Sequence, residues 1–124
     1  MGLKLEELNK FLRDYEKATN SHDFKKIKPF IEDNASYEFT NGSFKGIIEI
    51  QGAFEKTFNK IKNEVYKIYD LIWLFIDDKS AVCKYKFHWK GVINGKGEEG
   101  KGRGTNLIVD FDGQLKIFYE HLSK

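Results

Sequence analysis

The stretch Cys-Lys-Tyr-Lys-Phe-His-Trp-Lys at residues 83–90 decides the fold. Apolar and polar side chains alternate along it without interruption. Successive side chains of an extended chain point to opposite sides, so this pattern predicts a β-strand over residues 81–89. One face of that strand is then aromatic and buried, and the other, which carries Lys and His, is in contact with water.

Further strands are expected on both sides of this one. Residues 65–76 are rich in β-branched and aromatic side chains, and we interpret Asp70 within them as a bend. The turn signals around the strands are Asp77-Asp78-Lys79, a Gly-rich segment predicted to be a hairpin loop over Gly91–Gly100, and Asp112-Gly113. The last two strands are predicted over residues 102–111 and 115–122, and short connections of this kind make neighbouring strands antiparallel.

The first half of the chain has helical periodicity. Leu8, Leu12 and Tyr15 belong to an apolar series at steps of three and four, which predicts an amphipathic helix over residues 3–19. Asp23 is a suitable N-cap for a second, short helix, whose regularity Pro29 limits and which we expect to end at Asp33-Asn34.

A short strand and a third helix complete the first half. Residues 35–40 alternate as a strand, Asn41-Gly42 is a turn signal, and Phe44 begins a brief return strand. Residues 47–61 have the clearest helical period of the chain, and we attribute Gly52 within them to close approach of a neighbouring element. Helices separated from antiparallel strands define the α+β class.

Composition limits the possible functions. The chain has 124 residues, which predicts a single domain over residues 1–124, and its formal net charge of +2 argues against a nucleic-acid binder acting through its overall field. No run of residues is long and apolar enough for a membrane span, and no secretory signal is visible, so we expect a cytoplasmic protein. The lone Cys83 excludes a disulfide framework, and it is expected to be a buried, inert thiol.

Three stretches, taken in order, resemble one superfamily. They are YEKATNSHDFKKIKPFIEDNASYEFTNG (15–42), GIIEIQGAFEKTF (46–58) and GRGTNLIVDFDGQLKIFYEHLSK (102–124). They are similar to the NTF2-like superfamily, in particular its SnoaL-like and DUF4440 families and the ketosteroid isomerases, and the C-terminal His-Leu-Ser also resembles the association domain of calmodulin-dependent kinases. The resemblance implies a cystatin-like cone of curved antiparallel sheet packed on three helices, an apolar pocket between the two, and a homodimer formed through the outer face of the sheet.

The resemblance does not imply one activity. Alignment with the ketosteroid isomerases places Tyr15 on their oxyanion-hole Tyr, Asn106 near their second oxyanion donor, and Phe39 on their catalytic base. Because Phe cannot accept a proton, the same reaction with the same residues is excluded.

Other titratable or charged residues could serve the pocket. Strand alternation lets only one of Glu120 and His121 face it; the isomerase alignment favours Glu120, whereas the apolar alternation of the strand favours His121, and we lean towards Glu120. Arg103, between Gly102 and Gly104, could bind an anion if it points inward, or lie exposed near the rim of the sheet.

Cofactor and metal signals are weak. The GxGxxG pattern at residues 95–100 precedes a strand instead of a helix and contains two Glu residues, so it indicates a hairpin and not a dinucleotide site. The three His residues lack metal-ligand spacing, and the lysines of residues 84–90 indicate a solvated or dimer-forming face. We therefore expect no cofactor, no metal, no nucleic acid and no membrane as partners.

Three functions remain open. The first is a module that binds a small, largely apolar or carbonyl- or carboxylate-bearing molecule; the second is a lyase, isomerase or cyclase in which Tyr15 polarises a carbonyl and Glu120 or His121 moves a proton; the third is a dimerisation or scaffold domain without a ligand. The expected ligand-binding residues are Tyr15, Phe39, Phe54, Phe58, Trp73, Tyr85, Phe87, Trp89, Arg103, Asn106 and Glu120.

Overall fold

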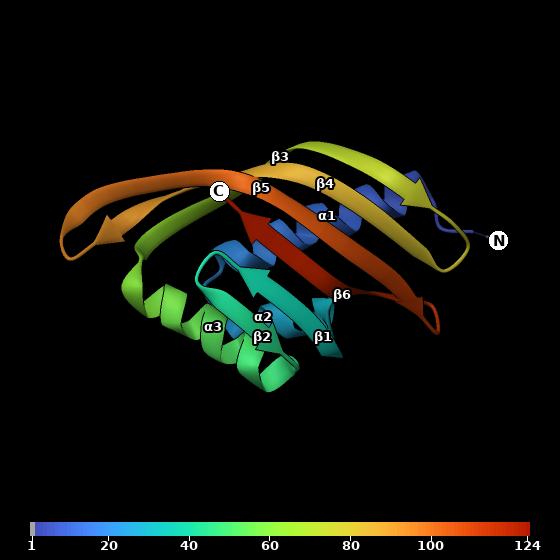
Figure 1. Ribbon diagram of the computed structural model, residues 1–124, viewed down its shortest axis with the longest axis horizontal. Helices are drawn as coiled ribbons and strands as arrows, with labels where there is room; N and C mark the ends of the chain where they lie inside the picture. Colours follow the sequence, from blue (N-terminus) through green and yellow to red (C-terminus); the bar gives the residue numbers. More distant parts are fainter. Residues whose placement is uncertain (1) are drawn as a thin grey trace.

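A computed structural model describes residues 2–124, and Figure 1 shows the arrangement of their elements. The elements are α1 (Leu5–Asn20), α2 (Phe24–Ile27), the 3₁₀ turn η1 (Lys28–Phe30), β1 (Ile31–Phe39), β2 (Gly42–Lys45), α3 (Ile47–Lys60), β3 (Lys62–Ile76), β4 (Ser80–Ile93), β5 (Lys96–Phe111) and β6 (Gln114–Ser123). The expected α+β class and the three helices of the N-terminal half are confirmed.

The strands form one curved sheet in the order β2-β1-β6-β5-β4-β3. Four of the five neighbouring pairs are antiparallel, as expected, but β1 and β6 are parallel, so the sheet is mixed. The reason is that β1 and β6 are separated by β2, α3 and three long strands. No short hairpin fixes their relative direction, as one does for every other pair.

The hairpin of β4 and β5 is longer than the sequence predicted. The loop expected over Gly91–Gly100 is wrong, because β4 continues to Ile93 and β5 begins at Lys96. The turn between them consists of Asn94 and Gly95, with φ of 52° and 77°. Two residues with positive φ match the twist of the flanking strands, so a tight turn replaces the loop. This hairpin forms the far left end of the sheet in Figure 1.

The short second helix ends sooner than predicted. Asp23 is its N-cap, and the Asp23 carboxylate accepts a hydrogen bond of 3.0 Å from the backbone N–H of Lys25. Pro29 lies in the 3₁₀ turn that follows, and β1 begins directly afterwards at Ile31, so the helix end expected at Asp33-Asn34 is wrong. Ile31 is buried and pairs with β6, which outweighs the helical spacing of the local sequence.

Two further expectations have different outcomes. Asp70 has a φ of 54°, and the pairing of β3 with β4 shifts between Tyr69 and Ile72, so the expected bend is confirmed as a β-bulge. Gly52 is exposed on α3, and a Cβ added there would meet nothing within 4 Å, so close approach does not explain it.

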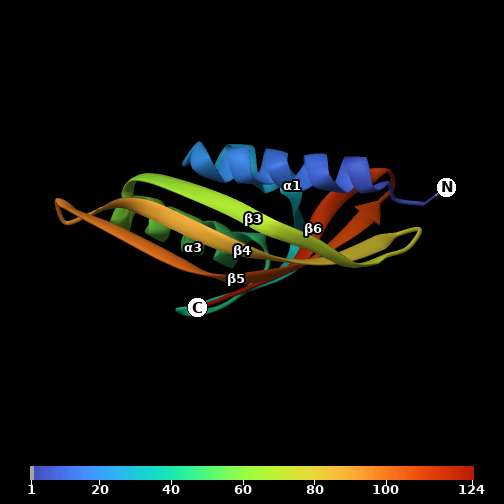
Figure 2. The same ribbon diagram turned by 90° about the horizontal axis from the view of Figure 1, so that it is seen from above.

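The helices cover one face of the sheet, which we call the inner face. Figure 2 shows α1 lying along this face beside β3, and Leu8, Leu12 and Tyr15 of α1 are buried against it. The opposite face of β3 to β6, which we call the outer face, has no helix on it. No helix among residues 2–124 is long and apolar enough to cross a membrane.

Candidate functional site

On the inner face, a column of three glycines on β5 leaves room for large aromatic rings of β4. In the register of β4 with β5, Tyr85 pairs with Gly104, Phe87 with Gly102 and Trp89 with Gly100. A Cβ added at any of these glycines would meet the ring of its partner, at 2.4 Å for Gly104 and Gly100 and 2.7 Å for Gly102. The three rings therefore lie flat across β5 where a side chain would otherwise stand. Gly102 and Gly104, the glycines on either side of Arg103, therefore leave space for the rings of Phe87 and Tyr85.

The ring of Tyr85 reaches a buried polar network through this space. Its hydroxyl donates a hydrogen bond of 2.8 Å to Oδ1 of Asn106. Nδ2 of Asn106 donates in turn to Oε1 of Glu120 at 3.1 Å, and the hydroxyl of Tyr15 donates to the same Oε1 at 3.0 Å. The hydroxyls of Tyr15 and Tyr37 lie 2.9 Å apart, so Tyr37 donates to Tyr15 when Tyr15 donates to Glu120. Residues of four elements, α1, β1, β4 and β5, thus hold the carboxyl of Glu120 on β6 in place.

Glu120 is the acidic centre of this network. Only 2% of the residue is exposed, and burial raises its pKa to about 7, although Asn106, Tyr15 and Tyr85 act in the opposite direction. Burial disfavours the ionised form more strongly than these polar groups favour it. Burial and the charge of Glu120 also raise the pKa of Tyr15 and Tyr37 well above the ordinary tyrosine value. The tyrosines remain neutral donors while Glu120 titrates near neutral pH.

Glu120 lies at the edge of an interior pocket of about 460 Å³. Both hydrogen bonds that residues 2–124 make to its carboxyl reach Oε1, and Oε2 accepts none of them. Seven of the 17 lining residues are aromatic, and eight are polar or charged. The lining residues are Tyr15, Thr19, Phe39, Thr40, Asn41, Phe54, Thr57, Phe58, Lys60, Ile61, Glu64, Tyr66, Phe87, Trp89, Glu120, Leu122 and Lys124.

Most of the residues expected from the sequence meet at this pocket. Seven lie where expected, because Tyr15, Phe39, Phe54, Phe58, Phe87, Trp89 and Glu120 line the pocket. Tyr85 and Asn106, also expected in the lining, do not line the pocket; they form the hydrogen-bond chain that reaches Glu120 from behind. Glu120 faces inward and His121 outward, so the choice between them is settled in favour of Glu120.

Two further expected pocket residues lie elsewhere. The indole N–H of Trp73 donates to Oδ1 of Asn9 at 2.7 Å, so the Trp73 ring packs under α1 and does not line the pocket. Arg103 is exposed on the outer face, because it is an odd number of residues from Asn106 on a regular strand. The inward orientation expected for Arg103 is therefore wrong.

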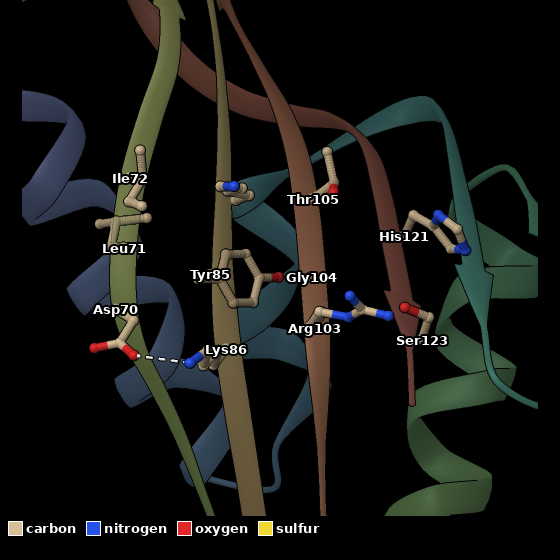
Figure 3. Close-up of a pocket in the computed structure, with 11 residues that line it drawn as sticks. Asp70, Leu71, Ile72, Tyr85, Lys86, Arg103, Gly104, Thr105, His121 and Ser123 are labelled. Carbon is tan, nitrogen blue, oxygen red and sulfur yellow. Dashed lines mark ion pairs between the residues drawn. The ribbon is translucent and has the colours of Figure 1, made fainter.

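Arg103 belongs instead to a groove of about 640 Å³ on the outer face, shown in Figure 3. Lys86 pairs there with Asp70 across 3.4 Å, and Arg103 and His121 extend from the neighbouring strands. The ring of Tyr85 lies behind β4 in this view, with its hydroxyl directed towards β5. The groove is an open, cationic surface and is separated from the pocket by the sheet.

Sequence reasoning missed Glu64, Tyr37 and Tyr66. Glu64 is on the inner face of β3, only 9% exposed, and burial raises its pKa to about 7. Its position two residues before Tyr66 places both side chains on the same face, which was the available signal. The backbone bulges at Asn63, with a φ of 55°. The bulge breaks the period-two alternation at the start of the strand, so the strand was predicted to begin only after Glu64.

Two properties limit the chemistry of the remaining groups. Burial raises the pKa of the Cys83 thiol to about 12, so Cys83 is inert as expected. Among residues 2–124, no three His, Cys, Asp or Glu side chains are grouped so that they could hold a metal ion. The pocket has two carboxyls, Glu120 and Glu64, each with a pKa of about 7.

The sequence and the fold identify the class of protein. Residues 8–124 match the SnoaL-like domain family, and the chain belongs to that family. No curated protein matches the sequence.

Solved structures of NTF2-like proteins share the fold. An NTF2-like superfamily protein from Salmonella enterica serovar Typhimurium superposes with a TM-score of 0.86 at 16% identity, over 95% of this chain and 88% of that one. The association domain of CaMKII from C. elegans gives 0.79 at 12%, over 96% and 94%. A proposed scytalone dehydratase from Novosphingobium aromaticivorans gives 0.82 at 13%, over 93% and 79%. The cone fold expected from the sequence is confirmed.

Proposed function

We propose that the chain binds a small, largely apolar molecule with one polar group in the interior pocket. The observation that carries the proposal is the Glu120 carboxyl, which lines the pocket and is held on one oxygen by Tyr15 and Asn106, while the other accepts no hydrogen bond from the described part of the chain. An aromatic enclosure with a few convergent polar groups is how small-molecule sites are generally built.

The protonation state of Glu120 determines with which polar group of a ligand it can form a hydrogen bond. With a pKa of about 7, Glu120 is present in both protonation states near neutral pH. The protonated carboxyl donates a hydrogen bond to a carbonyl or ether oxygen, and the ionised form accepts one from a hydroxyl or N–H group. Ring ketones and ring alcohols match this chemistry.

Calorimetric titration and thermal unfolding with 2-tetralone, 2-tetralol and tetralin test the proposal. A ligand that binds the native state at 100 times its Kd stabilises the protein by about 2.7 kcal/mol. We expect the ketone and the alcohol to raise Tm more than the hydrocarbon does. Thr57→Phe, which places a ring in the pocket, should abolish binding, whereas Lys84→Ala on the outer face should not. Failure of all three compounds to bind would refute the proposal.

A second candidate function is proton transfer at a carbon next to a carbonyl. The observation that favours it is the same carboxyl, because a general base works best when its pKa lies near the working pH. Oε2 of Glu120 would take the proton, and Tyr15, whose hydroxyl is engaged with Oε1, positions the carboxyl. The structural similarity to a proposed dehydratase is consistent with such chemistry.

Deuterium exchange tests this second candidate without knowledge of the natural substrate. Ionised Glu120 should accelerate the exchange of the α-protons of 2-tetralone in D₂O, with a rate that rises through a pH of about 7. Glu120→Gln should abolish the acceleration and leave binding of tetralin unchanged. Equal exchange rates with the wild type and with Glu120→Gln would leave binding alone as the function.

We also propose a homodimer formed through the outer face. Ile72 and Phe75 of β3 are about half exposed, and both pair with outer-face residues of β4. Exposed apolar groups of this size are typical of interaction surfaces. Sedimentation equilibrium should give the mass of two chains, and Ile72→Glu should give the mass of one. A single-chain mass for the wild type would refute the dimer and leave the pocket proposal unaffected.

A further inference from the structure

The pocket contains a second carboxyl, that of Glu64, which has no hydrogen-bond or ion-pair partner among residues 2–124. Glu64 is more than nine-tenths buried and lines the pocket. None of the side-chain hydrogen bonds and ion pairs formed by residues 2–124 involves its carboxyl oxygens. Its backbone carbonyl, in contrast, lies 2.9 Å from Nε2 of His22.

The charged groups near Glu64 do not form ion pairs with its carboxylate. Lys60 of α3 and Lys124 after β6 line the same pocket, but neither forms an ion pair with a carboxylate of the described part of the chain. Nε2 of His22, after α1, lies against the backbone carbonyl of Glu64, and the His22 ring is tilted against that of Phe58, with ring centroids 5.3 Å apart. Burial raises the pKa of the Glu64 carboxyl.

Glu64 and Glu120 lie at different ends of the pocket. Glu120 pairs with Asn106, which pairs with Cys83 on β4. Glu64 lies beside Gly91, since a Cβ at Gly91 would stand 3.3 Å from Cα of Glu64. Eight residues of β4 separate the two register positions, and both carboxyls line the one pocket of about 460 Å³. The two carboxyls therefore approach a bound molecule from separate strands, Glu64 from β3 and Glu120 from β6.

Aromatic residues line the pocket together with Glu64. Tyr66 follows Glu64 on the same face of β3 and pairs with Trp89 across the sheet, and Phe58 of α3 lines the same pocket. Ammonium groups are stabilised by the faces of such rings and by a desolvated carboxylate, whereas a neutral donor gains only the hydrogen bond.

We infer that Glu64, with the rings of Trp89, Tyr66 and Phe58, forms a cation site that holds a protonated amine of the ligand. This inference rests on the proposed binding function and names the ligand class: an apolar or aromatic body with an ammonium group at the Glu64 end and a hydrogen-bonding group at the Glu120 end. Binding requires the ionised carboxylate, so a proton leaves Glu64 when the amine binds below a pH of about 7.

Three indoles of similar shape test the inference by calorimetry at pH 8: tryptamine as the cation, 3-ethylindole as the neutral compound and indole-3-propionate as the anion. We expect tryptamine to bind at least about 10-fold more tightly than 3-ethylindole, which corresponds to about 1.4 kcal/mol. Glu64→Gln should remove this preference and retain 3-ethylindole binding. Glu120→Gln, the matched change at the other end, should keep the preference.

The outcomes separate the inference from the function on which it rests. If 3-ethylindole binds and tryptamine binds no more tightly, or if Glu64→Gln keeps the preference, the cation site is refuted and the pocket proposal stands. Tighter binding of indole-3-propionate would assign recognition to Lys60 and Lys124 and refute it as well. If none of the three binds, both proposals fail.

A direct spectroscopic measurement covers the case in which Glu64→Gln fails to fold. The ¹³C resonance of the Glu64 carboxyl reports its ionisation in the wild-type chain. Saturating tryptamine should move its midpoint to lower pH, by about one pH unit for each 10-fold preference for the ionised form. A Glu64 midpoint unchanged by tryptamine would overturn the inference.

Discussion

The two faces of β4, β5 and β6 differ more than any other two regions of the molecule, although they alternate residue by residue along the same strands. The inner face carries Tyr85, Asn106 and Glu120, all buried and joined by hydrogen bonds. The outer face carries Lys86 and Arg103, exposed on the neighbouring positions. A shift of one residue in register would exchange the two chemistries, so the pairing of the sheet defines the site.

Electrostatic interactions are also stronger on the inner face than on the outer face. Charges on the inner face lie in a medium of low effective dielectric constant, where burial alone changes a pKa by more than two pH units. Charges on the outer face are surrounded by water and salt, which screen them. Equivalent substitutions on the two faces should therefore have very different effects, and the following predictions test this.

The largest effect is expected at the glycine column. A Cβ at Gly102 would lie 2.1 Å from the carbonyl oxygen of Ser123 and 2.7 Å from the Phe87 ring, and the backbone oxygen cannot move without distorting β6. We expect Gly102→Ala to destabilise the protein by about 3 kcal/mol or more in urea unfolding.

Gly97→Ala is the matched control on the same strand, because a Cβ there meets nothing within 4 Å. It should be nearly neutral or slightly stabilising. Similar losses for the two variants would show that the space above Gly102 is not needed by the aromatic rings.

The second prediction concerns pH. The pKa of Glu120 rises from 4.5 to about 7 on folding, so the folded state holds its proton more tightly than the unfolded state does. Unfolding between these values releases a proton, and stability decreases as pH rises from about 5 to about 7, by roughly 3 kcal/mol for Glu120. Glu64, whose pKa is raised in the same direction, adds to the decrease.

Glu120→Gln removes one of the two titrating groups. Urea unfolding from pH 5 to pH 8 should show a shallower decrease for this variant, and the double variant with Glu64→Gln should be nearly independent of pH in this range. Stability that increases with pH in the wild type would contradict the raised pKa values of both carboxyls.

The third prediction concerns the support of Glu120. Tyr15→Phe removes the hydroxyl that joins Tyr37 to Glu120, and loss of such buried hydrogen bonds costs about 2 kcal/mol. The same hydroxyl lowers the pKa of Glu120, so its removal should move the pH transition upward. Tyr69→Phe, at an exposed position of β3, should change neither quantity. An unchanged pH transition in Tyr15→Phe would show that the hydroxyl does not stabilise the ionised carboxyl.

The sequence predicts most of this fold because local and tertiary preferences agree along most of the chain. The strict alternation of residues 83–90 and the helical period of residues 47–61 each match the observed element. The prediction failed where a distant partner decides, as at Ile31, whose place in β1 is fixed by pairing with β6. It also failed at residues 91–100, where the turn is confined to Asn94 and Gly95 and where Gly100 is accommodated in a strand by the Trp89 ring.

The sequence predicts on which face of the sheet a site residue such as Glu120 lies, but it does not predict which distant side chains meet there. Glu120 was correctly chosen over His121, but nothing local shows that Tyr37 would meet Tyr15, because that contact joins β1 to α1. Arg103 was misplaced because its flanking glycines were taken to clear space for Arg103. They clear space for Tyr85 and Phe87 on the other face. Glu64 was missed because a bulge precedes it.

The smallest effect is expected for the ion pair of Lys86 with Asp70 on the outer face. The nitrogen–oxygen distance is 3.4 Å, and the two side chains are 57% and 61% exposed. A double-mutant cycle with Lys86→Met and Asp70→Asn should give a coupling of no more than about 0.5 kcal/mol, which disappears in 0.5 M salt. The corresponding cycle on the inner face, with Tyr15→Phe and Glu120→Gln, should give a larger coupling that salt leaves unchanged. Equal couplings in the two cycles would mean that the inner face is hydrated, and that Glu120 then lacks the desolvation on which its role in the pocket depends.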